Sequence, residues 1–104
     1  DRIFGRKGDN LTIEVPVTID EAALGAHITV PTLDGDPVTL KVPAGTPTGR
    51  SLRVRGKGIR NGDLLVTIKV QVPAQLNEAQ REALEAYRAA SGGADPRADL
   101  LRRN

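Results

Sequence analysis

The sequence predicts a mainly β domain with one short helical turn and one C-terminal α-helix. Apolar and polar residues alternate with a period of two in five separate runs, a pattern typical of strands with one buried and one wet face. Turn residues rich in Gly, Asp and Pro separate these runs. Apolar residues at helical spacing occupy a single longer stretch near the C-terminal end.

Composition narrows the classes of protein to consider. At 104 residues the chain suits one domain, and its core must be aliphatic because Phe4 and Tyr87 are the only aromatic residues. The chain has no Cys, which excludes disulfides, thiolate catalysis and Cys-type zinc sites and fits a reducing compartment. No apolar run approaches the length of a membrane span. Since the chain begins at Asp1 rather than Met, we expect it to be a piece of a longer protein.

The first predicted strand covers residues 11–19, where Leu, Ile and Val occupy every second position. Pro16 falls on the opposite phase and has no N–H, so we expect a sheet edge or a bulge there. Residues 20–25 then predict a single helical turn, capped by Asp20 and ended by Gly25. The glycosylation sequon at residues 10–12 is interpreted as an unmodified strand start.

Three shorter runs predict a meander around which the rest of the chain is organised. They cover residues 28–30, 38–42 and 52–54. Asp34-Gly35 lies between the first two runs and is a strong hairpin signal, because Gly accepts a positive φ without a Cβ clash. A loop rich in Pro and Gly separates the second run from the third. The last strand covers residues 64–72 and stops at Pro73.

The last predicted element is a helix over residues 76–92. Asn77 is a suitable N-cap, and Gln80 allows a reciprocal capping box. The apolar stripe of this helix comprises Ala79, Ala83, Leu84, Ala86, Tyr87 and Ala90. Periodicity alone leaves two interpretations open. The stripe either docks on the sheet of its own chain or meets a second copy across a two-fold axis.

No group of residues favours an enzyme. Asp9, Asp34, Asp36 and Asp63 lie beside glycines without the spacing of a calcium loop, so we interpret them as turn residues whose carboxylates bond their own backbone. His27 is the only histidine; it lies on the polar phase of its strand with no nucleophile beside it in the sequence. We therefore predict no catalytic residue, no metal site and no cofactor.

A basic cluster is the one feature that favours an anionic partner. It comprises Arg50, Arg53, Arg55, Lys57 and Arg60. No acidic residue lies among these cations, so binding of nucleic acid or another anionic polymer is the alternative function. The competing interpretation is a solvated strand face and turn. It is favoured over nucleic acid, because the chain lacks aromatic residues on which bases stack and its net charge is only +2.

An ordered set of short motifs covers most of the chain. The set consists of Phe4-Gly5-Arg6-Lys7-Gly8-Asp9-Asn10-Leu11, Val15-Pro16-Val17, Ala22-Ala23-Leu24-Gly25, Val30-Pro31-Thr32-Leu33-Asp34-Gly35, Leu40-Lys41-Val42-Pro43-Ala44-Gly45-Thr46, Gly49, Arg53-Val54-Arg55-Gly56-Lys57-Gly58 and Gly62-Asp63-Leu64. In this order it resembles the second C-terminal β-domain of DnaJ-type co-chaperones, the J-domain proteins of the heat-shock family. Asp1 departs from the His usual in that family, and the segment between Lys57-Gly58 and Gly62-Asp63 is shorter than in many members.

The resemblance implies a small two-layered, mostly antiparallel β-sandwich that ends in a dimerisation helix. The expected division is a lead-in segment or end of a preceding β-domain (1–10), the β-domain (11–75), the dimerisation helix (76–92) and a polar tail (93–104). The resemblance also favours dimerisation over docking of the terminal helix. The expected dimer contacts are Leu76, Leu84 and Tyr87, with Leu100 and Leu101 reaching across to the partner.

The function implied by the resemblance is that of a non-enzymatic scaffold in a cytoplasmic stress-response chaperone system. Such a module pairs two copies of a co-chaperone, which binds unfolded client proteins and delivers them to a DnaK-type ATP-dependent chaperone. The tripeptide that stimulates the ATPase, the zinc repeats and the main client groove belong to other parts of such proteins. We therefore expect this chain not to stimulate ATP hydrolysis, bind zinc or hold clients strongly.

Overall fold

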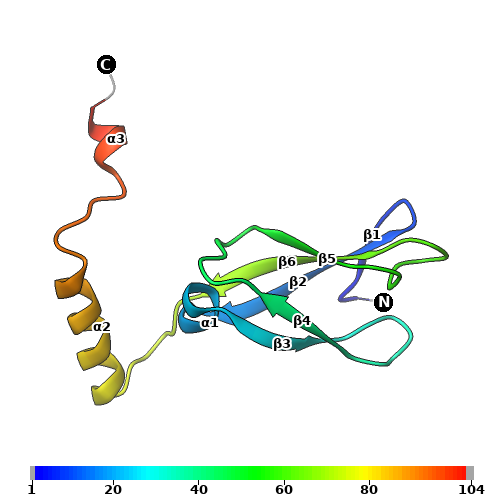
Figure 1. Cartoon of the computed structure of the whole chain (residues 1–104), viewed down its shortest axis with the longest axis horizontal. Helices are drawn as coiled ribbons and strands as arrows, with labels where there is room; N and C mark the ends of the chain where they lie inside the picture. Colours follow the sequence, from blue (N-terminus) through cyan, green and yellow to red (C-terminus); the bar gives the residue numbers. More distant parts are fainter. Residues whose placement is uncertain (1, 103–104) are drawn as a thin grey trace. The chain divides into compact units, whose positions relative to one another are not determined.

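The computed structural model describes residues 2–102 and divides into two compact units, Asp1–Val72 and Pro73–Asn104. We call them the β unit and the helical unit and describe each by itself. The β unit contains β1 (Gly5–Lys7), β2 (Asn10–Thr18), α1 (Ile19–Leu24), β3 (Ala26–Val30), β4 (Val38–Val42), β5 (Ser51–Val54) and β6 (Leu64–Gln71) (Figure 1). The helical unit contains α2 (Glu78–Ala90) and α3 (Ala98–Leu101).

The strands of the β unit form two sheets. The larger sheet has the order β1-β2-β6-β5, and β3 and β4 form the smaller one (Figure 1). This arrangement confirms the mainly β class. Most strand pairs are antiparallel, as expected, but at the centre of the larger sheet β2 and β6 pair in parallel, from Leu11 opposite Leu64 to Thr18 opposite Gln71. A parallel pair requires a long crossover, which here consists of α1 and the three strands β3, β4 and β5.

The predicted meander is divided between the two sheets. β3 and β4 pair as the expected hairpin, but β5 pairs with β6 in the larger sheet. The end of the loop after β4 is hydrogen-bonded to β6, so β5, which follows this loop, begins beside β6. The N–H of Gly49 donates to the carbonyl of Ile68 at 2.7 Å, and the N–H of Ile68 donates to that of Arg50 at 2.8 Å.

Helix α1 confirms the predicted helical turn but not its N-cap. Thr18 is the N-cap, and its hydroxyl accepts a hydrogen bond from the N–H of Glu21 at 3.4 Å. The carboxylate of Glu21 accepts in return from the N–H of Thr18 at 2.9 Å, which completes a capping box. Asp20 therefore lies inside the helix rather than at its cap. Gly25 ends the helix at a φ of 87°, as predicted.

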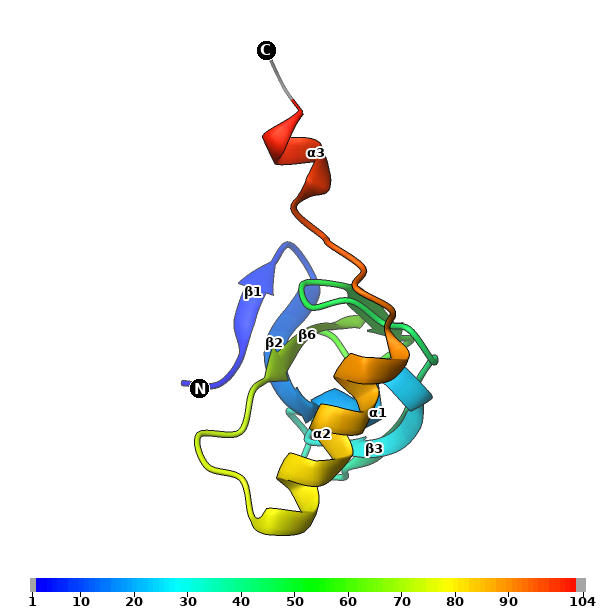
Figure 2. The ribbon, with the colours of Figure 1, turned by 90° about the vertical axis from the view of Figure 1, so that its left-hand side faces the viewer.

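The core of the β unit is one aliphatic cluster to which both sheets contribute. Its buried members are Leu11, Ile13, Val17, Ala22, Val30, Val42, Leu64, Val66 and Ile68. Every strand member lies on the apolar phase predicted from the alternation. Helix α1 closes one end of the two sheets (Figure 2) and contributes Ala22.

The edge predicted at Pro16 is confirmed. β1 pairs only with the first part of β2, from Asn10 to Thr12. Beyond Thr12, that side of β2 has no strand partner in the described part of the chain. Pro16 lies in this open stretch, where its missing N–H leaves no sheet hydrogen bond unmade.

The loop between β5 and β6 docks on the turn between β1 and β2. The carbonyl of Asp9 accepts a hydrogen bond from the N–H of Ile59 at 2.7 Å. An ideal Cβ atom would lie 1.8 Å from this carbonyl oxygen if placed on Gly62, and 2.6 Å from it if placed on Gly58. Since real Cβ atoms do not approach an oxygen so closely, only glycine fits at these two positions.

The helical unit begins with the predicted capping box. The side chain of Asn77 accepts from the N–H of Gln80 at 2.8 Å, and the side chain of Gln80 accepts from the N–H of Asn77 at 2.9 Å. Beyond α2, the segment predicted as a polar tail contains the single turn α3. No helix within residues 2–102 has both the length and the apolar character needed to cross a membrane.

We predict that Gly62→Ala lowers the free energy of unfolding by about 3 kcal/mol, because the added methyl group forces the docked loop away from Asp9. Urea denaturation followed by circular dichroism measures this change. Gly35→Ala is the matched control. Gly35 has a φ of 99° but open space around its Cβ position, so its substitution adds only backbone strain of about 1 kcal/mol. Equal losses in the two variants would contradict the close approach at Gly62.

Candidate functional site

Two surfaces carry the residues singled out in the sequence. The apolar face of the helical unit holds the predicted dimer contacts, and the basic cluster of the β unit holds the predicted anionic-partner residues. Among the residues that the structure describes, no group of acidic residues or histidine is arranged to hold a metal ion. His27 lies exposed on β3, opposite Lys41 of β4, so its interpretation as a surface strand residue is confirmed.

Within the helical unit, helix α2 leaves large apolar side chains exposed. Leu84 is 39% exposed and Tyr87 is 71% exposed. They are three residues apart and therefore neighbours on the helix surface. No residue of α2 is buried within its own unit. A helix of 13 residues is marginal in water without tertiary packing, so this face needs a covering partner.

A shallow depression brings two of the predicted contacts together. It has a volume of about 180 Å³ and is lined by Leu76, Arg81, Leu84, Glu85 and Arg88. The chain before the N-cap therefore folds back beside α2, which leaves Leu76 half-buried. An apolar centre surrounded by charged groups, with arginine among them, is typical of protein–protein contacts.

The other predicted contacts lie outside this depression. Tyr87 does not line it, and Leu100 and Leu101 belong to α3, where they are 65% and 80% exposed. The charged residues of the depression were missed from the sequence, although a signal was present. Arg81 and Arg88 lie three residues before and four residues after Leu84, the spacing that places side chains on one helix surface. Whether these side chains contact a second copy stays a prediction.

Acidic residues from other turns neutralise much of the basic cluster. Arg53 forms an ion pair with Asp63. The Nζ atom of Lys57 lies 3.6 Å from Oδ2 of Asp34. A third pair joins Arg60 to Asp9, with 3.4 Å between Nη1 and Oδ1. The stretch between Arg50 and Arg60 contains no acid, but folding brings three acids to it, so the anionic-polymer alternative is not favoured.

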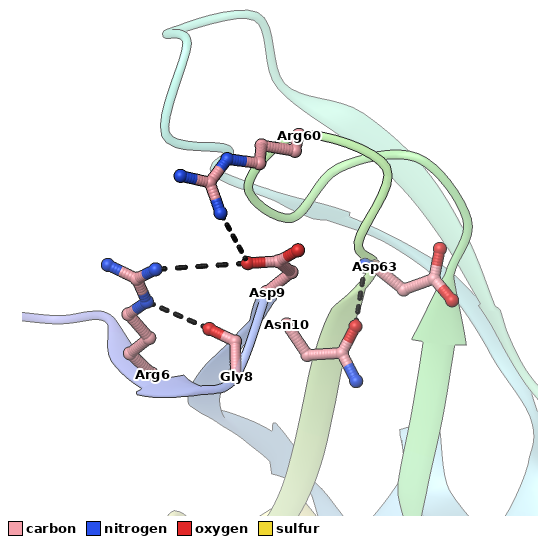
Figure 3. A network of polar contacts seen from close by, with 6 residues as sticks. All are labelled: Arg6, Gly8, Asp9, Asn10, Arg60 and Asp63. Carbon is pink, nitrogen blue, oxygen red and sulfur yellow. Dashed lines mark hydrogen bonds and ion pairs between the residues drawn. The ribbon is translucent and has the colours of Figure 1, made fainter.

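Figure 3 shows that two arginines contact one of these acids. Arg6 and Arg60 both reach the same carboxylate oxygen of Asp9, Oδ1, and Nη2 of Arg6 lies 3.8 Å from it. The Nε–H of Arg6 also donates to the carbonyl of Gly8 at 2.8 Å. The prediction that the Asp9 carboxylate bonds its own backbone is therefore wrong. The close approach of the β5–β6 loop places Arg60 beside it instead.

Backbone N–H groups also bond the carboxylates of two other aspartates. The predicted bond within the residue's own turn is confirmed for Asp34, whereas the backbone donor to Asp63 lies seven residues away. The N–H of Gly56 donates to the Asp63 carboxylate at 2.8 Å, and this bond together with the Arg53 side chain lowers the pKa of Asp63 below its ordinary value. The Asp34 carboxylate accepts from the Thr32 hydroxyl at 2.5 Å and from the N–H of Asp36 at 3.0 Å. These two bonds, led by that from Thr32, lower the pKa of Asp34.

Comparison with known proteins relates this chain to the C-terminal part of DnaJ proteins. The family model described as "DnaJ C terminal domain" matches residues 1–73. Chaperone protein DnaJ 1 of Streptomyces avermitilis is 59% identical over 104 residues, which cover 95% of this chain and 26% of that protein. Chaperone protein DnaJ 1 of Mycobacterium tuberculosis (strain H37Rv) is 57% identical over 105 residues, which cover 94% of this chain and 26% of that protein. The chain thus spans about a quarter of these relatives, and the similarity extends beyond the family model into the helical unit.

We predict that the Asp63 carboxylate contributes to stability at neutral pH and that this contribution is lost in acid. Its folded-state pKa lies below the value of about 3.9 expected for unfolded chains. The contribution is therefore fully present above about pH 4 and falls as the pH drops through the folded-state pKa. Urea unfolding of the natural chain and of Asp63→Asn across this range measures it. The difference between the two chains should shrink as the pH falls; a difference that grows in acid would contradict the assignment.

Proposed function

The chain belongs to the DnaJ C-terminal domain family, and from this premise we propose that it is the part of a DnaJ-type co-chaperone that joins two copies of the protein. The observation that carries the proposal is the apolar face of α2, which no residue of its own unit covers. The DnaJ co-chaperone family is not an enzyme family, and the proposed role is correspondingly one of geometry rather than catalysis.

The proposed partner of α2 is the same helix of a second copy. A two-fold axis brings the same surface of both copies together, and the alanines of the stripe let the two helices approach closely. The charges of α2 suit an antiparallel arrangement. Glu78 and Glu82 lie toward the N-terminal end of the helix and Arg88 lies in its last turn, so each arginine faces the acidic end of the other helix.

Residues 76–92 are the proposed dimerisation segment. Leu76, Leu84 and Tyr87 are its proposed contacts, and Leu100 and Leu101 are proposed to reach the other copy. The depression between Leu76 and Leu84 supports this assignment, because an apolar recess accepts an apolar side chain from a symmetry-related helix. Its arginines, Arg81 and Arg88, are available to pair with the glutamates of the second copy.

Dimerisation would serve the whole protein by placing two client-binding arms on one particle. Two linked arms raise the effective concentration of the second binding event without any new contact. The relatives are named chaperones, and we extend this to the longer protein. Its proposed partners are unfolded polypeptides and a DnaK-type ATP-dependent chaperone, and its proposed place of action is the cytoplasm.

We predict that this chain is a dimer in sedimentation equilibrium and that Leu84→Asp raises the dissociation constant roughly 30- to 1,000-fold. A carboxylate buried in the seam has no partner there, and loss of a central contact costs about 2–4 kcal/mol. Raised salt should change the natural dimer little, because salt does not screen its apolar contacts and exposed ion pairs beside them contribute little to the free energy of association.

The matched control is Ala89→Asp, which adds the same charge to α2 about 140° around the helix from Leu84. It should remain a dimer. Circular dichroism should show an unchanged β unit in both variants. A monomeric natural chain, or a Leu84→Asp chain that dimerises as tightly as the natural one, would contradict the proposal.

A further inference from the structure

The loop between β5 and β6 contains the dipeptide Asn61-Gly62, which belongs to neither of the surfaces described above. An asparagine followed by glycine is the sequence most prone to spontaneous deamidation, because glycine lets the backbone rotate freely and leaves its own nitrogen unshielded. The side chain of Asn61 is exposed and takes part in no hydrogen bond within residues 2–102. Its amide is therefore open to attack.

The chemistry needs only this chain and water. The backbone nitrogen of Gly62 gives up its proton to the solvent and attacks Cγ of Asn61. The bond between Cγ and the side-chain nitrogen breaks, ammonia leaves, and a cyclic succinimide forms. Water then opens the ring at either of its carbonyl groups and leaves aspartate or isoaspartate at position 61.

The native loop holds the attacking nitrogen in place. The N–H of Gly62 donates to the carbonyl of Ile59 at 2.8 Å, and the carbonyl of Gly62 accepts from the N–H of Gly58 at 3.0 Å. The carbonyl of Asp9 lies so close that a Cβ atom on Gly62 would be 1.8 Å from its oxygen. The succinimide has no N–H and needs a rotated backbone, so it cannot form while these contacts persist.

We propose that Asn61 is a latent modification site that the docked β5–β6 loop protects and that local opening of this loop activates. When opening and closing are fast compared with the reaction, the rate of deamidation follows the population of the open loop. Position 61 therefore becomes modified mainly in chains that spend time partly unfolded.

Isoaspartate at this position would prevent the loop from docking again. It inserts a methylene group into the main chain, and the strand β6 starts shortly afterwards at the fully buried Leu64. The intervening Asp63 is bonded on both sides. Its N–H donates to Oδ1 of Asn10 at 2.8 Å (Figure 3), and its carbonyl accepts from the N–H of Leu11 at 2.9 Å. The extra atom displaces Gly62 from Asp9 unless these bonds break. Aspartate adds a charge but keeps the length of the main chain.

The first experiment compares deamidation of the natural chain in native buffer and in urea at the same mildly alkaline pH. Peptide mapping by mass spectrometry measures the conversion of Asn61 over time. We expect conversion in urea to be about a hundredfold faster or more, since the native rate is reduced by the rarity of the open loop. Asn61→Ser is the control and should show no conversion at this position. Equal rates in native buffer and in urea, or no conversion at Asn61 in urea, would overturn the proposal.

A loosened loop provides an independent comparison. Asn10→Ala removes the acceptor for the N–H of Asp63, so Asn61 should convert several-fold faster than in the natural chain in native buffer, and at the same rate in urea. If Asn61 of a folded Asn10→Ala chain deamidated in native buffer at the rate of the natural chain, docking of the β5–β6 loop would not control the reaction.

The consequence for the fold is measured on chains converted in urea, separated and refolded. Chains with isoaspartate at position 61 should melt at a lower temperature than Asn61→Asp, which has the charge without the longer main chain. If chains with isoaspartate had the same melting temperature as the natural protein, docking of the loop would tolerate the added methylene group, contrary to the proposal.

Discussion

The close approach of the Asp9 carbonyl to Gly58 and Gly62 is the constraint on which the β unit depends. It holds the β1–β2 turn against the loop that leads into β6, and so sets Leu11 opposite Leu64. A slip of one residue between these strands would turn their apolar side chains toward solvent. The parallel pair is the centre of the larger sheet, so the rest of the core is built on a register that two glycines make possible.

Local patterns in the sequence predict the elements well but not how they pair. The alternation identifies the buried phase of β2 and β6, and the capping box of Asn77 and Gln80 marks the start of α2, because both signals involve residues close together in the chain. The parallel pairing, the transfer of β5 to the larger sheet and the ion pair between Arg60 and Asp9 join distant segments. No local pattern records such contacts. The N-cap at Thr18 was missed because Asp20 offered a second acceptable cap two residues away.

The candidate site shows the same division. Helical spacing places Leu84 and Tyr87 on one surface of α2. Leu76 was expected only from the family resemblance, and the structure brings it beside Leu84 by folding back the chain before the N-cap. The basic cluster was misleading in sequence because the acids that neutralise it come from other turns. The β unit thus pairs three cations of the basic cluster with acids from other turns, while the helical unit keeps an apolar face for the proposed second copy.

The most direct test of pairing through α2 is isotope-filtered nuclear Overhauser spectroscopy on a mixture of labelled and unlabelled chains. Tyr87 is the only tyrosine, so its ring signals are unambiguous. Pairing through α2 predicts contacts between the Tyr87 ring of one copy and the methyl groups of Leu84 or Leu76 of the other. Contacts of the Tyr87 ring with the β unit of its own chain, and none between copies, would show that α2 packs within its own chain and would contradict the proposed function.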